Sequence, residues 1–353
     1  MPAPWIVLHE GSRLRWGGDL RRHHVFLELA RRTGADLVDG WTAPKVRAAV
    51  AARRPSSWQR WRPRPRLASA EMLAPAVAAE VVRDCDAVIL DVHDDPLAQH
   101  AAFGLDVPSE RAVHLRALRE ANLAAFRLLA VPSASFAELA ALPSDRVIVA
   151  PNGTDCAHVR PLPPPEAPVV GMVSGAAPGR GIETLVDAAR VARSRERDLR
   201  LVLWLVATGA DSEAFLDGIR QSVAAESWIE VESAPYERLS ECLGRAAVLC
   251  VPHPAGPYMD AALPVKLFDA MAAGRPLVVT PRVEMRRVVE AAAAGLVAAD
   301  DSPEGLADVV VRLLGDPALR ARLGAAGRAA AEAQYDWRVI GSKLADEVLA
   351  RTR

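Results

Sequence analysis

Short runs of aliphatic residues alternate with longer amphipathic segments along this chain. The runs that predict strands are 5–9, 87–91, 127–131 and 146–150 in the first half, and 169–173, 200–206, 228–232, 247–251 and 276–280 in the second. They are apolar at successive positions, which is typical of parallel strands covered by helices on both faces. The amphipathic segments that predict helices include 18–33, 71–84 and 110–125. Strand and helix in rotation, twice over, predict an α/β fold with two Rossmann-like, doubly wound domains.

A proline-rich segment, PLPPPEAP at 161–168, lies between the two predicted domains. Proline has a fixed φ and no backbone N–H, so this segment favours a stiff, extended connector. We expect an N-terminal domain at 1–150, a linker at 151–168, a C-terminal domain at 169–334 and a final helix at 335–353 that returns toward the first domain. Two such domains generally bind ligand in the cleft between them, at the carboxyl ends of the strands.

Composition narrows the class of protein. The chain has 353 residues and a net charge of −1, with 51% hydrophobic and 25% charged residues. This balance is globular and gives no overall attraction to nucleic acid. No apolar run approaches the roughly 18 residues that span a bilayer, and MPAPWIVLHEGSR lacks the features of a signal sequence. The four cysteines are too sparse for a disulfide framework, so we expect a reduced, cytoplasmic protein.

Several segments carry a recognisable pattern. They are GGDLRRHHVFLELARRTGA from 17, DAVILDVHDDP from 86, RVIVAPNGTD from 146, VVGMVSGAAPGRGIETLVDAARVAR from 169, WIEVESAPYERLSECLGRAAVLCVPHP from 228 and PVKLFDAMAAGRPLVVT from 264. This pattern resembles the retaining glycosyltransferases of the GT-B fold, specifically glycosyltransferase family 4. The resemblance implies two domains facing each other across a cleft. It also implies transfer of a sugar from a nucleotide-activated donor without an essential metal or other cofactor.

The loop after the strand at 169–173 is a candidate anion site. It contains Gly175, Gly179 and Gly181, and Arg180 stands just before a predicted helix. A flexible loop, a cation and a helix N-terminus together can bind phosphate. The resemblance implies that Arg180 occupies the place of a phosphate-binding lysine, and that Ser174 stands where the family has an arginine. A glycine turn with a solvated arginine is the alternative.

The segment PVKLFDAMAAG is the sharpest motif. Pro264 favours the first turn of a helix, on which Lys266 and Asp269 share one face. The resemblance implies that Asp269 holds the donor ribose, that Lys266 binds phosphate, and that the helix start supplies N–H groups. The donor-binding residues expected at this helix are Pro264, Val265, Lys266, Leu267 and Asp269. The family has a glutamate eight positions before Asp269, where this chain has Ala261, and a surface ion pair is the alternative for Lys266 and Asp269.

In the first half, the candidate residues are a glycine pair and a histidine. Gly17 and Gly18 precede a predicted helix, and the resemblance implies that their loop closes over the donor phosphates. His93 follows the strand at 87–91, where a doubly wound domain places functional groups. The resemblance places it near the sugar and the acceptor, so it is the candidate catalytic residue. A structural histidine, or a metal site with the neighbouring aspartates, is the alternative.

Two weaker motifs complete the predicted site. Tyr236, in SAPYERL, falls where the family has a loop near the nucleotide base, and a plain helix cap fits this segment equally well. Asn152-Gly153 is a strong turn signal that the family places at the edge of the cleft.

The stretch 41–67 has eight basic residues and no acidic one, with Trp41, Trp58 and Trp61 interleaved. Such a composition suits an anionic membrane surface, a lipid-linked acceptor or a nucleic-acid backbone. Because the stretch lies in the acceptor-side domain, we favour the acceptor or a lipid surface. The alternative is a solvated insertion whose tryptophans pack on their own domain.

The motifs together predict a retaining glycosyltransferase that uses a nucleotide-diphosphate sugar. The acceptor would be a small molecule, a glycan or a lipid-linked sugar, and nucleic acid is not expected as a partner. Because Ala261 and Ser174 depart from the family, a non-catalytic nucleotide-sugar-binding protein is one alternative. Another GT-B enzyme, such as a nucleotide-sugar epimerase or a phosphorylase, is the other.

Overall fold

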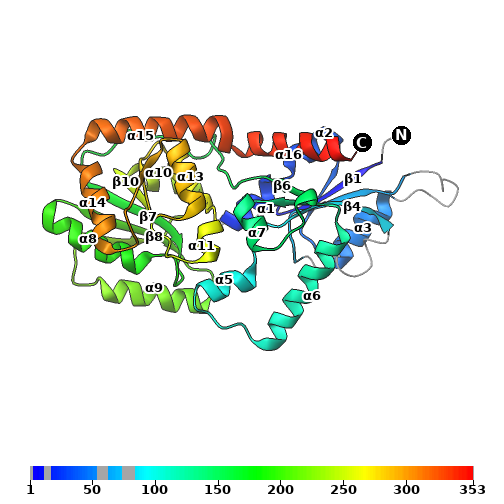
Figure 1. Cartoon of the computed structure of the whole chain (residues 1–353), viewed down its shortest axis with the longest axis horizontal. Helices are drawn as coiled ribbons and strands as arrows, with labels where there is room; N and C mark the ends of the chain where they lie inside the picture. Colours follow the sequence, from blue (N-terminus) through cyan, green and yellow to red (C-terminus); the bar gives the residue numbers. More distant parts are fainter. Residues whose placement is uncertain (1–2, 12–16, 54–62, 74–83, 353) are drawn as a thin grey trace. The chain divides into compact units, whose positions relative to one another are not determined.

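The computed structural model describes residues 3–11, 17–53, 63–73 and 84–352, and the chain forms two compact units (Figure 1). The N-terminal unit comprises Met1–His100, Asp106–Pro151 and Trp337–Arg353, and the C-terminal unit comprises Ala101–Leu105 and Asn152–Asp336. The chain therefore contributes residues 101–105 to the C-terminal unit before it forms the rest of that unit from 152 onward. Its last helix belongs to the N-terminal unit again.

The N-terminal unit is built on a parallel sheet. Its strands are β1 Trp5–His9, β2 Asp36–Asp39, β3 Arg66–Ser69, β4 Asp86–Asp91, β5 Leu128–Val131 and β6 Val147–Val149. Their order is β2-β1-β3-β4-β5-β6, and each neighbouring pair is parallel. The helices are α1 Gly17–His24, α2 Leu27–Thr33, α3 Ala43–Arg53, α5 Pro96–Ala102, α6 Ser109–Ala125, α7 Ala134–Leu139 and α16 Trp337–Arg351, with a short 3₁₀ turn, η2 Ser144–Arg146.

The final helix α16 is an integral part of the N-terminal unit. Arg32 on α2 is paired with Asp346 on α16, and the Arg66 guanidinium on β3 donates to the Thr352 carbonyl at 2.8 Å. Gly341 packs so closely on α2 that an added Cβ would lie 3.2 Å from the Cβ of Glu28. A segment more than 180 residues away in sequence from β6 thus completes this unit.

The C-terminal unit repeats the architecture. Its strands are β7 Val169–Gly175, β8 Arg200–Val206, β9 Ile229–Glu232, β10 Val248–Val251, β11 Leu277–Val279 and β12 Gly295–Val297. Their order is β12-β11-β10-β7-β8-β9, again with parallel neighbours. The helices are α8 Ile182–Arg195, α9 Ala210–Ser222, α10 Leu239–Gly244, α11 Pro257–Ala261, α12 Val265–Ala272, α13 Val283–Ala291, α14 Pro303–Leu314 and α15 Pro317–Ala330, with η3 Tyr236–Arg238 and the π-helical η4 Ala331–Tyr335.

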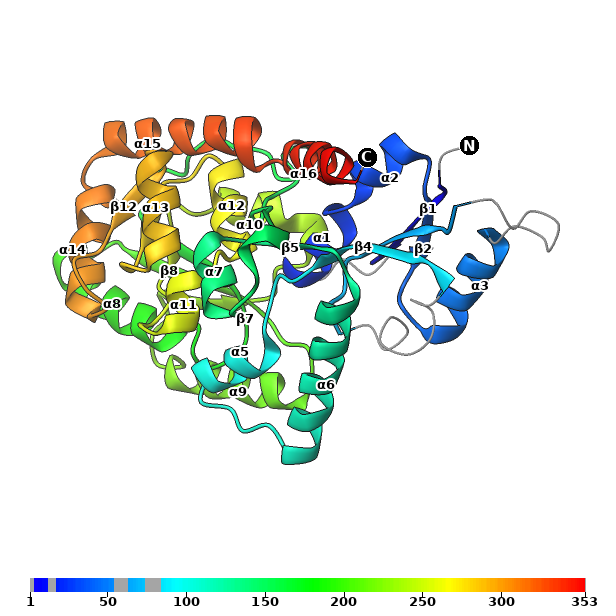
Figure 2. The ribbon, with the colours of Figure 1, turned by 45° about the vertical axis from the view of Figure 1, so that its right-hand side comes forward.

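Alternation along β8 shows why this sheet is covered on both faces. Leu201, Leu203 and Leu205 belong to one buried cluster, with residues of α8, α9 and α14. Val202 and Trp204 belong to a second, with residues of α10, α12 and α13. Successive side chains of a strand point to opposite faces, so a continuous apolar run needs two helix layers. Figures 1 and 2 show these layers, with α8 and α9 on one side of the sheet and α10 and α13 on the other.

The predicted α/β fold with two doubly wound domains is confirmed. The expected helix at 18–33 is two helices, α1 and α2, and most of the expected helix at 71–84 lies outside the described residues. Three strands were not predicted: β2, β3 and β12. The segment 161–168 has no regular secondary structure, and the buried Arg275 guanidinium donates to the Leu162 and Pro163 carbonyls at 3.0 and 2.9 Å.

Candidate functional site

The strand order of the C-terminal unit places a site at one edge of its sheet. From β7 the chain moves to β8 and β9 on one side, and later to β10, β11 and β12 on the other. Two loops therefore diverge at the carboxyl ends of β7 and β10, which is where open α/β sheets bind ligands. Residues 176–181 form the first loop and residues 252–256 the second.

The two loops touch at Gly181. Gly181 has φ +76° and precedes α8, and a Cβ added there would lie 1.8 Å from the Pro252 carbonyl oxygen. Only glycine fits such a left-handed position in direct contact with backbone. The contact holds Arg180 beside the start of α8. Its guanidinium lies 4.5 Å from the ring centroid of Phe103, which the chain supplies from its short 101–105 excursion.

Lys266 brings a second cation to this edge. It lies in the first turn of α12, after Pro264, and its ammonium donates a 3.0 Å hydrogen bond to the Ser174 hydroxyl at the end of β7. Burial and the nearby Arg180 charge hold the Lys266 pKa well below its usual 10.5. The structure thus brings together three predicted residues, Ser174, Arg180 and Lys266. A cationic group whose charge is disfavoured in the free protein is well placed to gain from an anion.

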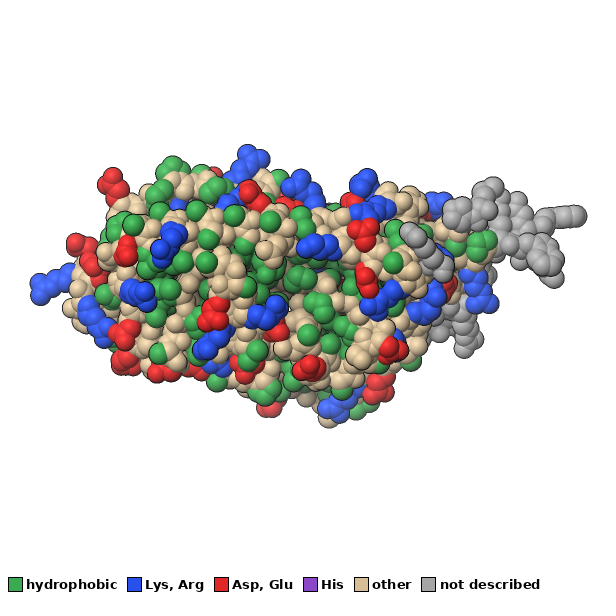
Figure 3. Space-filling model, turned by 45° about the horizontal axis from the view of Figure 1, so that its top comes forward, with side chains coloured by type: hydrophobic (Ala, Val, Ile, Leu, Met, Phe, Trp, Pro, Cys, Tyr) green, Lys and Arg blue, Asp and Glu red, His purple; other side chains and the backbone are tan. Residues whose placement is uncertain are grey.

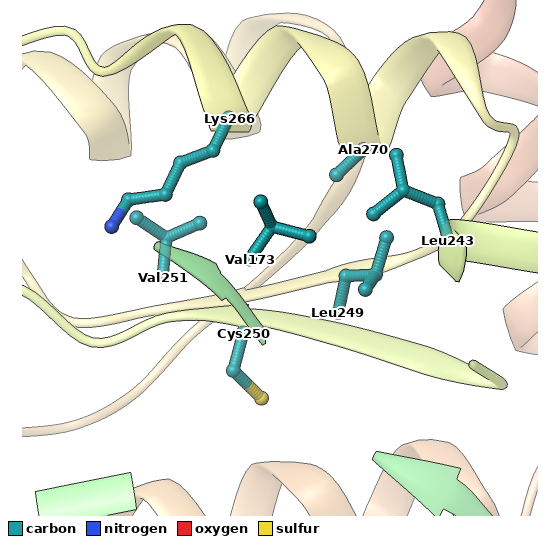
Figure 4. A pocket seen from close by; sticks show the side chains of 7 residues that line it. All are labelled: Val173, Leu243, Leu249, Cys250, Val251, Lys266 and Ala270. Carbon is teal, nitrogen blue, oxygen red and sulfur yellow. The ribbon is translucent and has the colours of Figure 1, made fainter. Parts of the chain in front are cut away.

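Figure 4 shows how the lysine reaches this position. Its stem extends from α12 toward Val251, and its nitrogen lies beside Val251, away from Leu243 and Leu249. A cavity of about 10 Å³ lies among these side chains, close to the volume that one water needs. The apolar lining packs the aliphatic stem, while the charged end projects toward the carboxyl end of β10.

Two functional candidates at this edge were missed. His253 follows β10, is 1% exposed, and has a pKa well below 6.5 because of burial and the charges of Lys266, Arg180 and Arg282. Arg282 follows β11, and its guanidinium lies 2.6 Å from Asp301 and 3.4 Å from Asp260. The sequence did carry a signal for His253, because it comes two residues after an aliphatic run that predicts a strand, as His93 does.

Asp269 and Lys266 do not pair with each other, and each has its own hydrogen-bond partner. Asp269 is 6% exposed, and its Oδ1 accepts a 2.8 Å hydrogen bond from the Thr154 hydroxyl. Burial raises its pKa to about 7, with Asp155 adding to the effect and the Thr154 hydrogen bond opposing it. Lys266 bonds to Ser174 instead. A buried carboxyl with one hydroxyl partner retains lone pairs for further donors, such as the hydroxyls of a ribose.

Tyr236 lies close to this carboxyl. Its ring stacks on His158 with centroids 4.2 Å apart, and His158 Nε2 lies 2.7 Å from the Tyr236 carbonyl oxygen. Burial and the charges of Asp269 and Asp155 raise the Tyr236 pKa. Asn152, in the predicted turn, donates to the Leu263 carbonyl at 2.6 Å, just before α12. An aromatic pair beside Asp269 offers a flat surface next to the candidate ribose site.

In the N-terminal unit, His93 lies beside a buried ion pair. Its Nδ1 is 2.8 Å from Asp91 Oδ2, and Arg21 Nη2 donates to Asp91 Oδ1 at 2.7 Å. Arg21 also donates to the Ala150 carbonyl at 2.8 Å. Burial alone would raise the Asp91 pKa, but the contacts with Arg21 and His93 outweigh this effect and lower it. The contact with Asp91 Oδ2 fixes the orientation of the imidazole ring.

The remaining candidates of the N-terminal unit are the glycine pair and the aspartates near His93. Gly17 and Gly18 begin α1, whereas the preceding residues 12–16 lie outside the described part of the chain. Asp95, offered as a metal ligand, caps α5 by accepting from the Leu97 and Ala98 amides at 3.1 Å. Among the described residues, no group of three or more His, Cys, Asp or Glu side chains is placed to hold a metal ion.

The basic stretch 41–67 is only partly described. It forms α3 at one end and β3 at the other, while 54–62, with Trp58 and Trp61, lies outside the described residues. Trp41 packs under Arg22, 5.6 Å from ring centroid to guanidinium carbon. Elsewhere, Figure 3 shows basic and acidic side chains interspersed on the face in view. Within the described segments, no helix combines the length and apolarity needed to cross a membrane.

Comparison with known proteins identifies relatives of this site. Residues 167–316 match the model of a family described as glycosyl transferases group 1. A GDP-mannose-dependent monoacylated α-(1-6)-phosphatidylinositol monomannoside mannosyltransferase from Corynebacterium glutamicum is 24% identical over 58% of this chain and 56% of that protein. A phosphatidyl-myo-inositol mannosyltransferase from Mycobacterium leprae is 41% identical over 28% of this chain and 25% of its own length. The chain spans about half the length, or less, of these curated relatives.

Solved structures share the fold over nearly the whole chain. Sucrose-phosphate synthase from Thermosynechococcus elongatus has a TM-score of 0.71 at 16% identity, covering 99% of both chains. HepE from Anabaena, in complex with UDP and glucose, has a TM-score of 0.72 at 15% identity, covering 99% of this chain and 100% of that one. At such identities the likeness concerns the fold, and it agrees with the GT-B class expected from the motifs.

Proposed function

We propose, from the match of residues 167–316 to the family described as glycosyl transferases group 1, that this protein transfers a sugar from a nucleotide-diphosphate donor to an acceptor hydroxyl, with retention of configuration. The observation that carries the proposal is the meeting of Arg180 and Lys266 at the carboxyl ends of β7 and β10. Two cations beside the starts of α8 and α12 suit a diphosphate, because helix N-termini also present N–H groups and positive potential.

The chemistry assigns a separate task to each part of the site. When the bond from the anomeric carbon to the diphosphate breaks, negative charge grows on the leaving oxygen. Arg180 and Lys266 neutralise that charge, so the proposal needs no metal ion or other cofactor. Asp269 accepts hydrogen bonds from the donor ribose, and the Tyr236–His158 pair faces the base. Gly17 and Gly18 let backbone approach the phosphates.

The acceptor oxygen forms the new bond on the face that the diphosphate leaves, which gives retention. Its proton passes to the departing diphosphate oxygen, so the step balances without an enzymic nucleophile. His93 positions the reacting hydroxyl, with Asp91 fixing the orientation of its ring. Ordering both substrates supplies much of the rate enhancement.

The relatives suggest which substrates to test first. These relatives include mannosyltransferases named for GDP-mannose and for phosphatidylinositol acceptors. We therefore propose GDP-mannose as the first donor candidate and a lipid-linked or phosphoinositide-linked sugar as the first acceptor candidate. The family's first glutamate, eight positions before Asp269, is replaced here by Ala261, which is 3% exposed, so the proposed sugar contact differs from the usual one.

A binding and turnover experiment tests the proposal. The melting temperature is measured with GDP, UDP, ADP and their sugars, because specific binding stabilises the folded state by mass action. The best donor is then incubated with and without acceptors, and free nucleotide and product are quantified by mass spectrometry. Product that appears only with acceptor supports transfer, whereas tight binding without turnover on any acceptor would favour the non-catalytic alternative. The absence of a shift with every nucleotide contradicts the proposal.

A further inference from the structure

His253 is a buried polar side chain without a visible task in the free protein. Its ring is 1% exposed, and neither ring nitrogen has a hydrogen-bond partner among the residues that the structure describes. Buried polar groups are nearly always hydrogen-bonded, because leaving one unsatisfied costs about 1–3 kcal/mol. An unpartnered imidazole at the end of a core strand therefore needs an explanation beyond packing.

The backbone holds this ring firmly in place. The His253 carbonyl accepts a 2.6 Å hydrogen bond from the Thr280 hydroxyl, at the end of β11. The preceding residue, Pro252, packs against Gly181 so tightly that no side chain fits between them. His253 is thus fixed between the ends of β10 and β11, next to the loop that carries Arg180.

The charges around His253 are of one sign. Lys266 on α12, Arg180 in the β7–α8 loop and Arg282 after β11 all act on the imidazole and disfavour its protonation. Arg282 is balanced by Asp301 and Asp260, whereas the hydrogen-bond partner of Lys266 is the neutral Ser174 hydroxyl. A neutral imidazole has one N–H donor and one acceptor nitrogen, and an anion drawn in by these cations would bring acceptor oxygens to it.

We propose that His253 is a binding residue for the diphosphate of the nucleotide ligand, with one ring nitrogen donating a hydrogen bond to a phosphate oxygen that Arg180 and Lys266 attract. The inference rests on the proposed function and adds a neutral hydrogen-bond donor to the two cations. A hydrogen bond weakens steeply away from the direction of its donor, so this N–H would define where one phosphate oxygen lies. In the free protein this ring N–H has no acceptor, which lowers stability, but the donor is already in position when the ligand arrives.

Two variants of similar size separate binding from packing. His253→Leu removes both ring nitrogens, while His253→Gln keeps a donor and an acceptor. Affinities for GDP, UDP and inorganic pyrophosphate are measured by calorimetry, and melting temperatures are measured without ligand. We expect His253→Leu to raise the melting temperature and to weaken binding about tenfold or more, since hydrogen bonds to charged groups are the strong ones. His253→Gln should bind more tightly than His253→Leu despite being less stable.

The outcomes distinguish this inference from the proposed function. If the wild type binds nucleotide and His253→Leu binds equally well, the inference is wrong and the proposed function stands. If the wild type binds pyrophosphate in a manner that depends on His253 but transfers no sugar, the anion site stands and the function fails. If the wild type binds neither, both are wrong. Should His253→Leu not fold, the ¹⁵N shifts of the His253 ring in the wild type decide: they should move on adding pyrophosphate, and unchanged shifts overturn the inference.

Discussion

The hydroxyl of Thr154 donates a 2.8 Å hydrogen bond to Oδ1 of Asp269. This aspartate is buried in the C-terminal unit. This single neutral donor does not offset the loss of hydration around the carboxyl. The Asp269 pKa consequently rises to about 7. The candidate ribose ligand is therefore a group that exchanges its proton near neutral pH.

This relationship predicts a pH dependence. Because the pKa of Asp269 is higher in the folded protein than in the unfolded chain, folding takes up a proton between about pH 4 and 7. The favourable contribution is present below pH 4 and is lost as the pH rises toward 7. Asp269→Asn removes the titration, so we expect its melting temperature to exceed that of the wild type at pH 8 by more than at pH 5. An equal difference at both pH values contradicts the assigned titration.

Gly181→Ala should destabilise the C-terminal unit. The substitution places a Cβ 1.8 Å from the Pro252 carbonyl oxygen at a residue with φ +76°. Left-handed backbone alone costs about 1–2 kcal/mol, and the clash adds to it. We expect a loss of at least about 2 kcal/mol in denaturant unfolding. Gly175→Ala, at the end of β7 where an added Cβ meets nothing within 4 Å, is the matched control and should change stability by less than about 0.5 kcal/mol. Similar losses in both variants would argue against the Gly181–Pro252 contact.

Lys266→Met should separate stability from ligand affinity. Met fills much of the same volume without a charge, so it removes the cost of burying an ammonium near Arg180. We expect a higher melting temperature for the free protein at neutral pH and a nucleoside-diphosphate affinity weaker by about 1.5–3 kcal/mol. Calorimetry measures the affinity, and Lys266→Arg is the charge-retaining control. Unchanged affinity in Lys266→Met would remove its phosphate role.

Asp91→Asn should be strongly destabilising. It leaves the Arg21 guanidinium, whose side chain is 1% exposed, without its charged partner. Breaking a buried pair in this way costs about 3–5 kcal/mol. Replacing both partners, as Arg21→Met with Asp91→Asn, should recover part of the loss. The wild type should also lose stability in acid, because the Asp91 pKa is lowered on folding and its contribution disappears as the pH falls through that value. A double variant less stable than Asp91→Asn would contradict this account.

The basic stretch 41–67 predicts contact with anionic membranes. Eight basic residues and interleaved tryptophans should bind vesicles that contain phosphatidylinositol or phosphatidylserine. Because such attraction is screened by salt, co-sedimentation should fall steeply between about 0.05 and 0.5 M salt. Vesicles of neutral phosphatidylcholine are the control. Equal pelleting with both vesicle types, or none with either, removes the membrane role.

Much of the fold was predictable because the information is local. A run such as RLVLWLV is apolar at successive positions, which by itself predicts a strand that is buried on both faces. These seven residues are therefore enough to predict β8. The strands that were not predicted lack such a run. In β2, which reads DLVD, half-buried and exposed residues alternate, and β3 begins with Arg66 beside an arginine- and proline-rich stretch. Such strands are determined by their pairing with β1, which is a property of the folded sheet.

The site was predictable residue by residue but not as an arrangement. The motifs singled out Ser174 and Lys266, yet their hydrogen bond joins residues 92 positions apart. Thr154 escaped notice because an ordinary threonine becomes significant only beside Asp269, 115 positions later. The order of β7 and β10 in the sheet creates these meetings, and that order is not written in either strand alone.

The placement of α16 has a consequence for biosynthesis. The N-terminal unit needs α16 to cover α2 and to provide the partner of Arg32, and it needs Thr352, just after that helix, to provide the partner of Arg66. A ribosome delivers those residues only after the whole C-terminal unit has been made. The N-terminal unit, although translated first, therefore stays incomplete until α16 has been made. The C-terminal unit already has all of its strands by then. We expect the C-terminal unit to finish folding before the N-terminal unit, the reverse of the order of synthesis.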